Sequence, residues 1–294
     1  MHKREYIAGA ITIILAICLL SMWGYNLLHT LYEEHTAIVN GTPITYLIKG
    51  KPTGKPVLLL HGNGGSHKDL YVMTDLLAQA GYLVWAPDSR GQGANPPLSE
   101  YHYADMADDM YHFVQEVIKP YYNRPHTAQA VYYKVSELTA ALITSCENIS
   151  RRDNALVPPA VFGWSDGGII ALMTEVNYPG TWSAIITSGA NINPDCGAWD
   201  IEAERANPAD TSALYRMMLY EPQMTAQDMA SIQCPALIVA GENDLISLEH
   251  THLIGDNIPN GQVMIVRGAD HGSHIEHSPK MGRIVVDYLK QINY

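Results

Sequence analysis

The chain has 294 residues, 18 of them Lys or Arg against 30 Asp or Glu, and 47% of its residues are hydrophobic. A net charge of −12 argues against a nucleic-acid-binding protein, which needs basic residues to meet phosphates. The hydrophobic fraction excludes a disordered chain. The first 32 residues hold two basic residues and one acidic residue, which leaves 16 basic and 29 acidic residues, a net charge of −13, on residues 33–294. The sequence therefore predicts an acidic globular part behind a nearly neutral apolar leader.

The apolar leader runs from Tyr6 to Leu28 without a charged residue. As a helix it would be about 34 Å long, enough to cross a hydrocarbon core of about 30 Å. Two basic residues precede it and two glutamates follow, so the positive-inside bias predicts a cytoplasmic N-terminus. We expect residues 1–32 to form a cytoplasmic stub and a transmembrane signal anchor, with the remainder of a single-pass cell-membrane protein outside the cytoplasm. A cleaved signal peptide and a secreted protein are the alternative.

Residues 33–294 contain no flexible linker and no internal repeat, so we expect one α/β domain. His35–Val39 and Pro43–Ile48 flank Asn40-Gly41, a pair that suits the tight type I′ turn of a β-hairpin. Short apolar runs without alternation then predict strands covered on both faces, at 56–60, 82–86, 160–162, 184–187, 236–239 and 263–266. Segments of helical periodicity separate these runs, which predicts a mostly parallel central sheet with helices on both faces. Such sheets place their chemistry in the loops at the carboxyl ends of the strands.

One motif points to a nucleophile. Residues 163–168 read Gly-Trp-Ser-Asp-Gly-Gly, fit the pattern G-x-S-x-G, and stand between a predicted strand and a predicted helix. A nucleophilic serine in this context lies on a cramped strand-to-helix turn, and the flanking glycines let the backbone pass close by. We therefore predict that Ser165 is a catalytic nucleophile.

A nucleophilic serine needs a histidine base that a carboxylate orients. Asp244 and His271 each follow a predicted strand, so both are expected at the sheet edge where Ser165 lies. We predict Asp244 as the acid and His271 as the base. The alternatives are Glu242 or Asp195 as the acid and His274 or His277 as the base. The histidine spacing does not fit a helical His-Glu-x-x-His zinc motif, so we expect no metal and no organic cofactor.

Two backbone N–H groups are predicted to bind the oxyanion of the tetrahedral intermediate. The first belongs to Asp166, the residue after the nucleophile. The second should come from the glycine-rich loop His61–Gly65, and we assign it to Asn63.

These motifs resemble those of the α/β-hydrolase superfamily, over roughly residues 39–289. The resemblance rests on GWSDGG together with H-G-x-G at 61–64, D-x-R-G-x-G at 88–93, G-x-N-D at 241–244 and G-A-D-H at 268–271. Residues 163–172 look most like the biphenyl-hydrolase-like and valacyclovirase branch and related bacterial esterases. The resemblance implies the α/β-hydrolase fold and a triad of Ser165, Asp244 and His271. Haloalkane dehalogenases and epoxide hydrolases share the fold but carry an aspartate nucleophile, so Ser165 argues against both.

Two segments depart from the simplest form of such a domain. Residues 119–157 form an insertion, in which apolar spacing predicts an amphipathic helix at 127–149. We expect this helix to pack on the domain's own surface, with a homodimer or membrane-side contact as the alternative. Residues 191–233 occupy the usual lid position, and their methionines would offer a soft apolar wall to a substrate.

The neighbours of the nucleophile, Trp164 and Asp166, are candidate substrate-binding residues. The Asp166 carboxylate could pair with a substrate amine, or it could do no more than cap the helix that follows it.

We therefore predict a membrane-anchored serine hydrolase that cleaves carboxylic esters through an acyl-enzyme. Its partners would be a small-molecule ester or amide and, through Tyr6–Leu28, the lipid bilayer, with no nucleic acid. The acidity of the domain favours neutral or cationic esters. An aminopeptidase or amidase, or a cofactor-free perhydrolase, on the same triad is the enzymatic alternative. A hydrolase-fold receptor or scaffold without catalysis is the alternative of another class.

Overall fold

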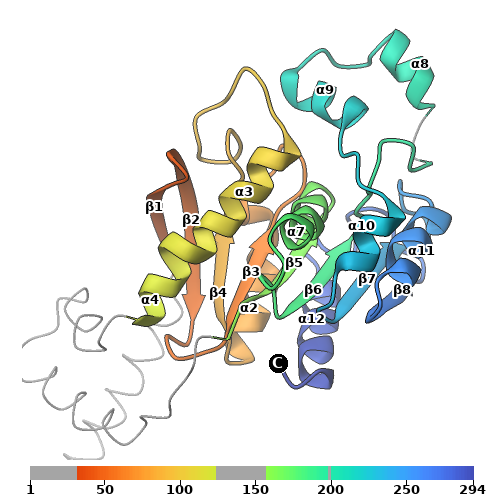
Figure 1. Cartoon of the computed structure of the whole chain (residues 1–294). Coiled ribbons are helices and arrows are strands. Elements are labelled where there is room, and N and C mark those ends of the chain that lie inside the picture. Colours follow the sequence, from red (N-terminus) through yellow and green to blue (C-terminus); the bar gives the residue numbers. More distant parts are fainter. Residues whose placement is uncertain (1–31, 124–156, 198–199) are drawn as a thin grey trace, which may run out of the picture.

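The computed structural model describes residues 32–123, 157–197 and 200–294. The predicted anchor at 6–28 and the predicted helix at 127–149 lie outside these residues. Within the described ranges, no helix combines the length and the apolar character needed to cross a bilayer. The described strands form a single sheet in the order β1-β2-β4-β3-β5-β6-β7-β8 (Figure 1).

The strands match the predicted apolar runs closely. β4, β3, β5, β6, β7 and β8 run parallel, and β2 pairs antiparallel with both of its neighbours, β1 and β4, at one side of the sheet. Their bounds are Glu33–Val39 for β1, Thr42–Gly50 for β2, Pro56–Leu60 for β3, Leu83–Pro87 for β4, Ala160–Trp164 for β5, Ala184–Ser188 for β6, Ala236–Gly241 for β7 and Gly261–Val266 for β8. The prediction of a mostly parallel α/β sheet is therefore confirmed.

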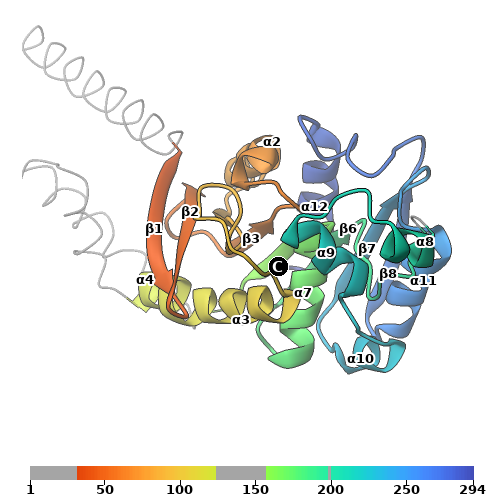
Figure 2. The same ribbon diagram turned by 90° about the horizontal axis from the view of Figure 1, so that it is seen from above.

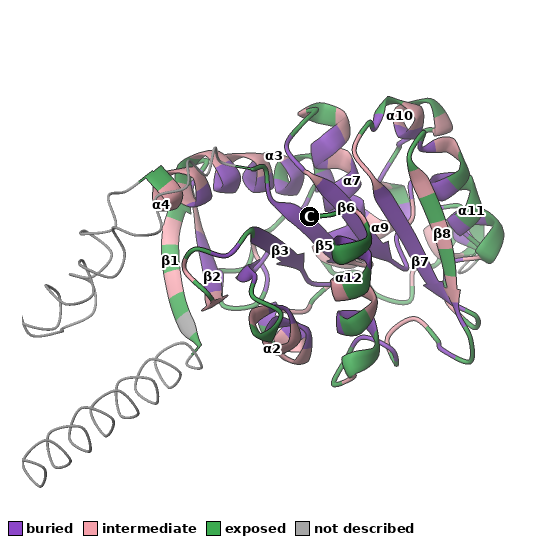
Figure 3. Cartoon of the chain, turned by 90° about the horizontal axis from the view of Figure 1, so that it is seen from below, coloured by how far each residue is buried: buried purple, intermediate pink, exposed green. Residues whose placement is uncertain are grey.

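The first two strands form the predicted hairpin. Asn40 and Gly41 have φ values of 48° and 75°, the two positive values that a type I′ turn requires, and the pairing begins with Val39 opposite Thr42. The prediction that every later strand is covered on both faces is wrong for β8. This strand lies at the edge of the sheet, and residues 261–265 alternate between half-buried and exposed, with Met264 39% exposed, before the buried Val266 (Figure 3).

Helices cover both faces of the sheet (Figure 2). Their bounds are Tyr71–Gln79 for α2, Tyr103–Phe113 for α3, Asp166–Asn177 for α7, Ala226–Ser231 for α10, Leu248–Asn257 for α11 and Pro279–Gln291 for α12. α3 continues through a π-helical turn, Val114–Ile118, into α4, Lys119–Asn123. The α3, α7, α10 and α11 helices lie on one face, and α2 and α12 lie on the other.

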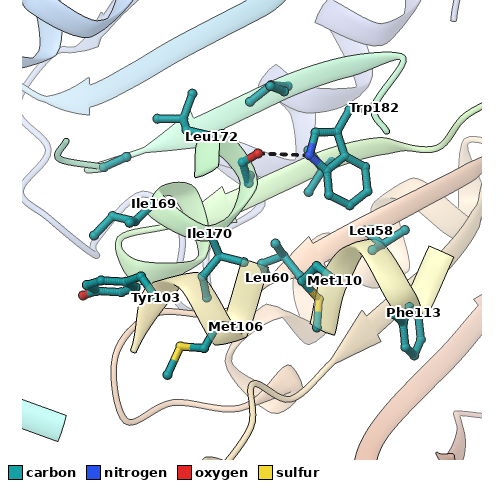
Figure 4. Packing of buried hydrophobic residues seen from close by; sticks show 14 of the residues in the cluster. Leu58, Leu60, Tyr103, Met106, Met110, Phe113, Ile169, Ile170, Leu172 and Trp182 are labelled. Carbon is teal, nitrogen blue, oxygen red and sulfur yellow. Dashed lines mark hydrogen bonds between the residues drawn. The ribbon is translucent and has the colours of Figure 1, made fainter. Parts of the chain in front are cut away.

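Each face has its own hydrophobic core. On the α3 and α7 side, Met106 and Met110 of α3 and Ile170 of α7 pack over Leu58 and Leu60 of β3 (Figure 4). On the opposite side, side chains of β3, β4 and β5 pack against α2 and α12. Because successive residues of β3 point to opposite faces, this five-residue strand contributes to both cores.

The lid region contains two further helices, α8 (Ile201–Ala206) and α9 (Ala213–Tyr220), in an arm that projects beyond the sheet (Figure 1). We expected the methionines of this region to line the substrate cavity. Met218 does so in the cavity described below. Met217, Met224 and Met229 are instead buried in the core on the α3 and α7 face.

We expect Leu59→Ala to lower the free energy of unfolding by about 2–5 kcal/mol, because it empties a fully buried position between the sheet and α2. Ile38→Ala is the matched control, since the Ile38 side chain is 67% exposed, and it should change stability by less than about 0.5 kcal/mol. Urea denaturation of both variants checks this, and equal losses would contradict the assignment of the core.

Candidate active site

Ser165 lies on the turn between β5 and α7. Its φ of 52° and ψ of −116° are unusual for a residue with a side chain. Two glycines permit this turn: a Cβ on Gly163 would lie 2.2 Å from the Gly167 oxygen, and one on Gly167 would lie 2.2 Å from the Leu60 oxygen. The predicted glycines therefore allow α7 to start directly against β3 and β5, with the serine at the apex.

The structure brings the three predicted triad residues together in hydrogen-bonding order. His271 Nε2 lies 3.0 Å from Ser165 Oγ, and His271 Nδ1 lies 2.6 Å from Asp244 Oδ1. Asp244 follows β7 and His271 follows β8, so three separate loops meet at the carboxyl edge of the sheet. The geometry suits proton transfer from the serine hydroxyl to the imidazole.

The side chain of Asp244 is fully buried, and its surroundings keep it ionised. Burial favours the neutral acid, but hydrogen bonds from His271 and from the backbone N–H groups of Ile246 and Gly241 outweigh this effect and lower the pKa of Asp244. The ionised Asp244 carboxylate accepts a hydrogen bond from the protonated Nδ1 of His271. This leaves His271 Nε2 without a proton and able to accept the proton of the serine.

The alternative acids and bases lie elsewhere. The Glu242 carboxylate accepts a hydrogen bond from the Gly268 N–H, and Asp195 is exposed. His274 is buried, with its Nε2 2.8 Å from Ser188 Oγ, and His277 is exposed. In the part of the chain that the structure describes, no group of three or more His, Cys, Asp or Glu side chains is arranged to hold a metal ion.

The loop after β3 lies beside Ser165, since a Cβ added to Gly62 would lie 3.5 Å from the Ser165 Cβ. The Gly62 carbonyl accepts the Gly65 N–H at 3.1 Å and lies 2.7 Å from His61 Nδ1, while the Gly64 N–H donates to Gln92 Oε1 at 2.7 Å. Since a trans peptide points its C=O and N–H in opposite directions, these contacts direct the Asn63 N–H away from them. Among the described residues, no acceptor is found for this N–H.

The Asp166 carboxylate neither caps the helix nor stands open to solvent. It accepts a hydrogen bond from the Tyr103 hydroxyl at 2.7 Å and another from Asn63 Nδ2 at 2.8 Å. Asp166 is 3% exposed, and burial raises its pKa to about 6, against the opposing effect of these two bonds. The alternative in which this carboxylate does no more than cap α7 is therefore wrong, because side chains of two other elements donate to its two oxygens.

Ser165 opens into a cavity of about 250 Å³. Apolar and polar side chains line it: Gly62, Asn63, Tyr103, Trp164, Asp166, Asn191, Cys196, Met218, Glu221, Leu245, Ile246 and His271. Both candidate substrate-binding residues are among them, and the Trp164 indole N–H also donates to the His271 carbonyl at 3.0 Å.

Sequence reasoning missed Tyr103 and Glu221. Tyr103 begins α3, and Glu221 follows α9 and accepts the Tyr103 N–H at 3.0 Å. Neither residue lies in a recognisable motif, so no signal in the sequence could have assigned them to the site.

We expect Asp166→Asn to change how stability depends on pH. Because the folded-state pKa of about 6 exceeds the ordinary 3.8, the folded protein binds more protons than the unfolded chain between these values. This contribution to stability is complete below pH 4 and is lost as the pH rises through 6. The difference in free energy of unfolding, Asp166→Asn minus wild type, should therefore increase by at most about 3 kcal/mol between pH 4 and pH 8. Urea denaturation at both pH values measures it, and a pH-independent difference would contradict the prediction.

The chain is similar in sequence to known hydrolases. A family model described as alpha/beta hydrolase fold matches residues 55–120. Serine hydrolase BPHL from Mus musculus is 24% identical over 159 residues, which are 45% of this chain and 54% of that protein. The chain thus spans about half the length of this relative. Lipase 3 from Moraxella sp. (strain TA144) is 23% identical over 254 residues, 81% of this chain and 78% of that protein.

Solved structures resemble the chain over almost its whole length. One described as a membrane phospholipase A and bacterial virulence factor superposes with a TM-score of 0.64 at 16% identity, covering 99% of both chains. An esterase from Exiguobacterium antarcticum gives a TM-score of 0.63 at 18% identity, covering 88% of this chain and all of its own. At these identities the likeness concerns the fold. With the strand order and the motifs, it confirms the predicted resemblance in fold, and the chain has the α/β-hydrolase fold.

Proposed function

We propose that this protein is a serine hydrolase that cleaves carboxylic esters through an acyl-enzyme. The observation that carries the proposal is the hydrogen-bonded series from Asp244 through His271 to Ser165 at the wall of a cavity. A serine hydroxyl becomes nucleophilic only when a base can remove its proton, and this arrangement supplies the base and the group that orients it.

In the proposed acylation step, His271 Nε2 takes the proton of Ser165 as Oγ attacks the acyl carbon. The Asp244 carboxylate stabilises the imidazolium that forms. The backbone N–H groups of Asn63 and Asp166 bind the oxyanion, as two donors from the nucleophile turn and the β3 loop do in this type of site.

His271 then gives its proton to the leaving alkoxide, so the carbon–oxygen bond of the ester breaks and the alcohol departs. A water molecule, deprotonated by the same imidazole, attacks the acyl-enzyme. The acid leaves and Ser165 regains its proton, which closes the cycle without a redox partner.

The volume and the charge of the cavity suit small substrates that are neutral or cationic. Its volume of about 250 Å³ lies just below the range of about 300–1,000 Å³ typical of small-molecule sites. Asp166 and Glu221 contribute carboxylates, and the lining residues named above include no Lys or Arg. The names of the relatives, serine hydrolase, lipase and esterase, fit ester cleavage. An amide substrate would use the same groups.

We further propose that Tyr6–Leu28 anchors the chain in the cell membrane, with the N-terminus in the cytoplasm and the catalytic domain outside. The uncharged run and its flanking charges support this. The similar structure described as a membrane phospholipase A is consistent with it. Tyr32, where the described residues begin, stacks on Tyr71 of α2 and donates to Asp75 at 2.7 Å, so the chain would leave the domain beside α2.

Labelling with a fluorophosphonate probe tests the proposed activity. We expect the wild type to be labelled and Ser165→Ala not to be. Asp244→Asn should lower kcat by roughly 10⁴-fold on acyl esters of graded chain length, because His271 would then hold its proton on the wrong nitrogen.

A folded wild type that resists the probe would favour the non-catalytic receptor or scaffold. Labelling combined with turnover of peptides alone would favour the aminopeptidase, and peracid formation the perhydrolase.

The anchor is tested by alkaline extraction of membranes. We expect the full chain to stay with the membrane and to keep its uncleaved mass. Leu15→Lys combined with Leu19→Lys should release it, because each central lysine costs about 2.5–3.5 kcal/mol of insertion free energy. A mature chain that lacks residues 1–28 would show a cleaved signal peptide instead.

A further inference from the structure

The two proposed oxyanion donors come from loops far apart in the sequence. The Asn63 N–H belongs to the loop after β3, and the Asp166 N–H belongs to the first residue of α7. A displacement of about 1 Å between such groups can cost 10²-fold in rate, so their separation must be held.

We propose that Asp166 is a positioning residue. Its carboxylate binds the Asn63 side chain and thereby holds the two oxyanion donors at a fixed separation. This inference rests on the function proposed above. Asp166 would then act twice: its backbone N–H touches the oxyanion, and its side chain controls where the other donor lies.

The contacts of the carboxylate support this role. Asn63 Nδ2 donates to Asp166 Oδ2 at 2.8 Å, and the Tyr103 hydroxyl donates to Oδ1 at 2.7 Å. Tyr103 is 1% exposed and Asp166 3% exposed, so little water competes for the carboxylate. Hydrogen bonds to an ionised acceptor in such surroundings are short and strong. Tyr103 fixes the carboxylate against α3, and the carboxylate in turn fixes Asn63.

No other side-chain hydrogen bond of the described loop joins it to the nucleophile turn, although the two segments also pack together at Gly62 and Gly167. The bonds of Gly62 and Gly64 run to His61, Gly65 and Gln92, so they shape the loop but do not tie it to the nucleophile turn. Among the described residues, the Asn63–Asp166 bond is the one side-chain hydrogen bond between residues 61–65 and 163–168. Losing it would leave the loop well formed and packed, but would remove the polar bond that sets the position of Asn63 relative to Ser165.

Recognition of a substrate amine by Asp166 is the competing role. Both carboxylate oxygens already accept a hydrogen bond from the protein, and the residue is almost fully buried. The geometry therefore favours a carboxylate that organises the site over one that waits for a ligand.

A double-mutant cycle on the full chain tests the proposal. Asn63→Ala removes the side-chain donor but keeps the backbone N–H, and Asp166→Ala removes the acceptor. For a neutral acyl ester we expect each variant to lower kcat by roughly 10-fold, less than the roughly 10²–10³-fold cost of losing a donor itself, with KM changed less than about twofold. The double variant should be no slower than the slower single variant, because both break one contact.

Affinity for an alkyl boronic acid gives a second measurement, since its serine adduct places an oxygen between the two donors. It should fall about 10-fold in Asn63→Ala, in parallel with kcat. Asn260→Ala is the control: it removes an exposed asparagine that bonds the Gln233 carbonyl far from the cavity, and both measurements should stay at wild-type values.

Several outcomes would overturn the inference. They are an Asn63→Ala variant with wild-type kcat, additive losses in the double variant, or a loss confined to KM. Selective loss of α-amino esters in Asp166→Ala, with Asn63→Ala unchanged, would assign the carboxylate to amine binding. If Asp166→Ala does not fold, Asn63→Ala with its control still decides. An inactive wild type would instead overturn the proposed hydrolase function, so the two failures are distinct.

Discussion

Ser165 holds a backbone conformation that costs a residue with a side chain on the order of 1–3 kcal/mol, with φ at 52°. The packing of α7 over β3 and β5 maintains it, and this packing needs Gly163 and Gly167, where any side chain would strike the backbone. The loops after β7 and β8 begin at the same edge of the sheet, so Asp244 and His271 can reach the serine from there. The geometry of the whole site therefore depends on this one close approach of a helix to two strands.

The two buried aspartates of the site show how surroundings set a side chain's chemistry. Asp244 receives an imidazole and two backbone N–H groups, which together outweigh burial and lower its pKa. Asp166 receives two neutral side-chain donors, and burial prevails, so its pKa rises. The first carboxylate is thus suited to stabilise a positive imidazolium, while the second is suited to bind neutral donors that shape the site.

Much of the fold could be predicted because its signals are local. Continuous apolar runs marked β3 to β7, and Asn40-Gly41 marked the hairpin, since two positive φ values favour those residue types. The exposed residues of β8 were not foreseen, because its place at the sheet edge depends on strand order and not on its own composition. The core positions of Met217 and Met224 were not predicted either, because a methionine suits a cavity wall and a core equally well.

The nucleophile motif and the order in which the proposed acid and base follow it could be predicted from the sequence, because they depend on residue types beside strand ends. The choice of His271 over His274 as the histidine that faces Ser165 came from the tertiary structure, since both follow β8 and lie only three residues apart. Tertiary contacts alone also decided the partners of Asp166. Tyr103 and Asn63 lie 63 and 103 positions away along the chain, and hydrogen bonds over such separations depend on how layers pack, which no local pattern records.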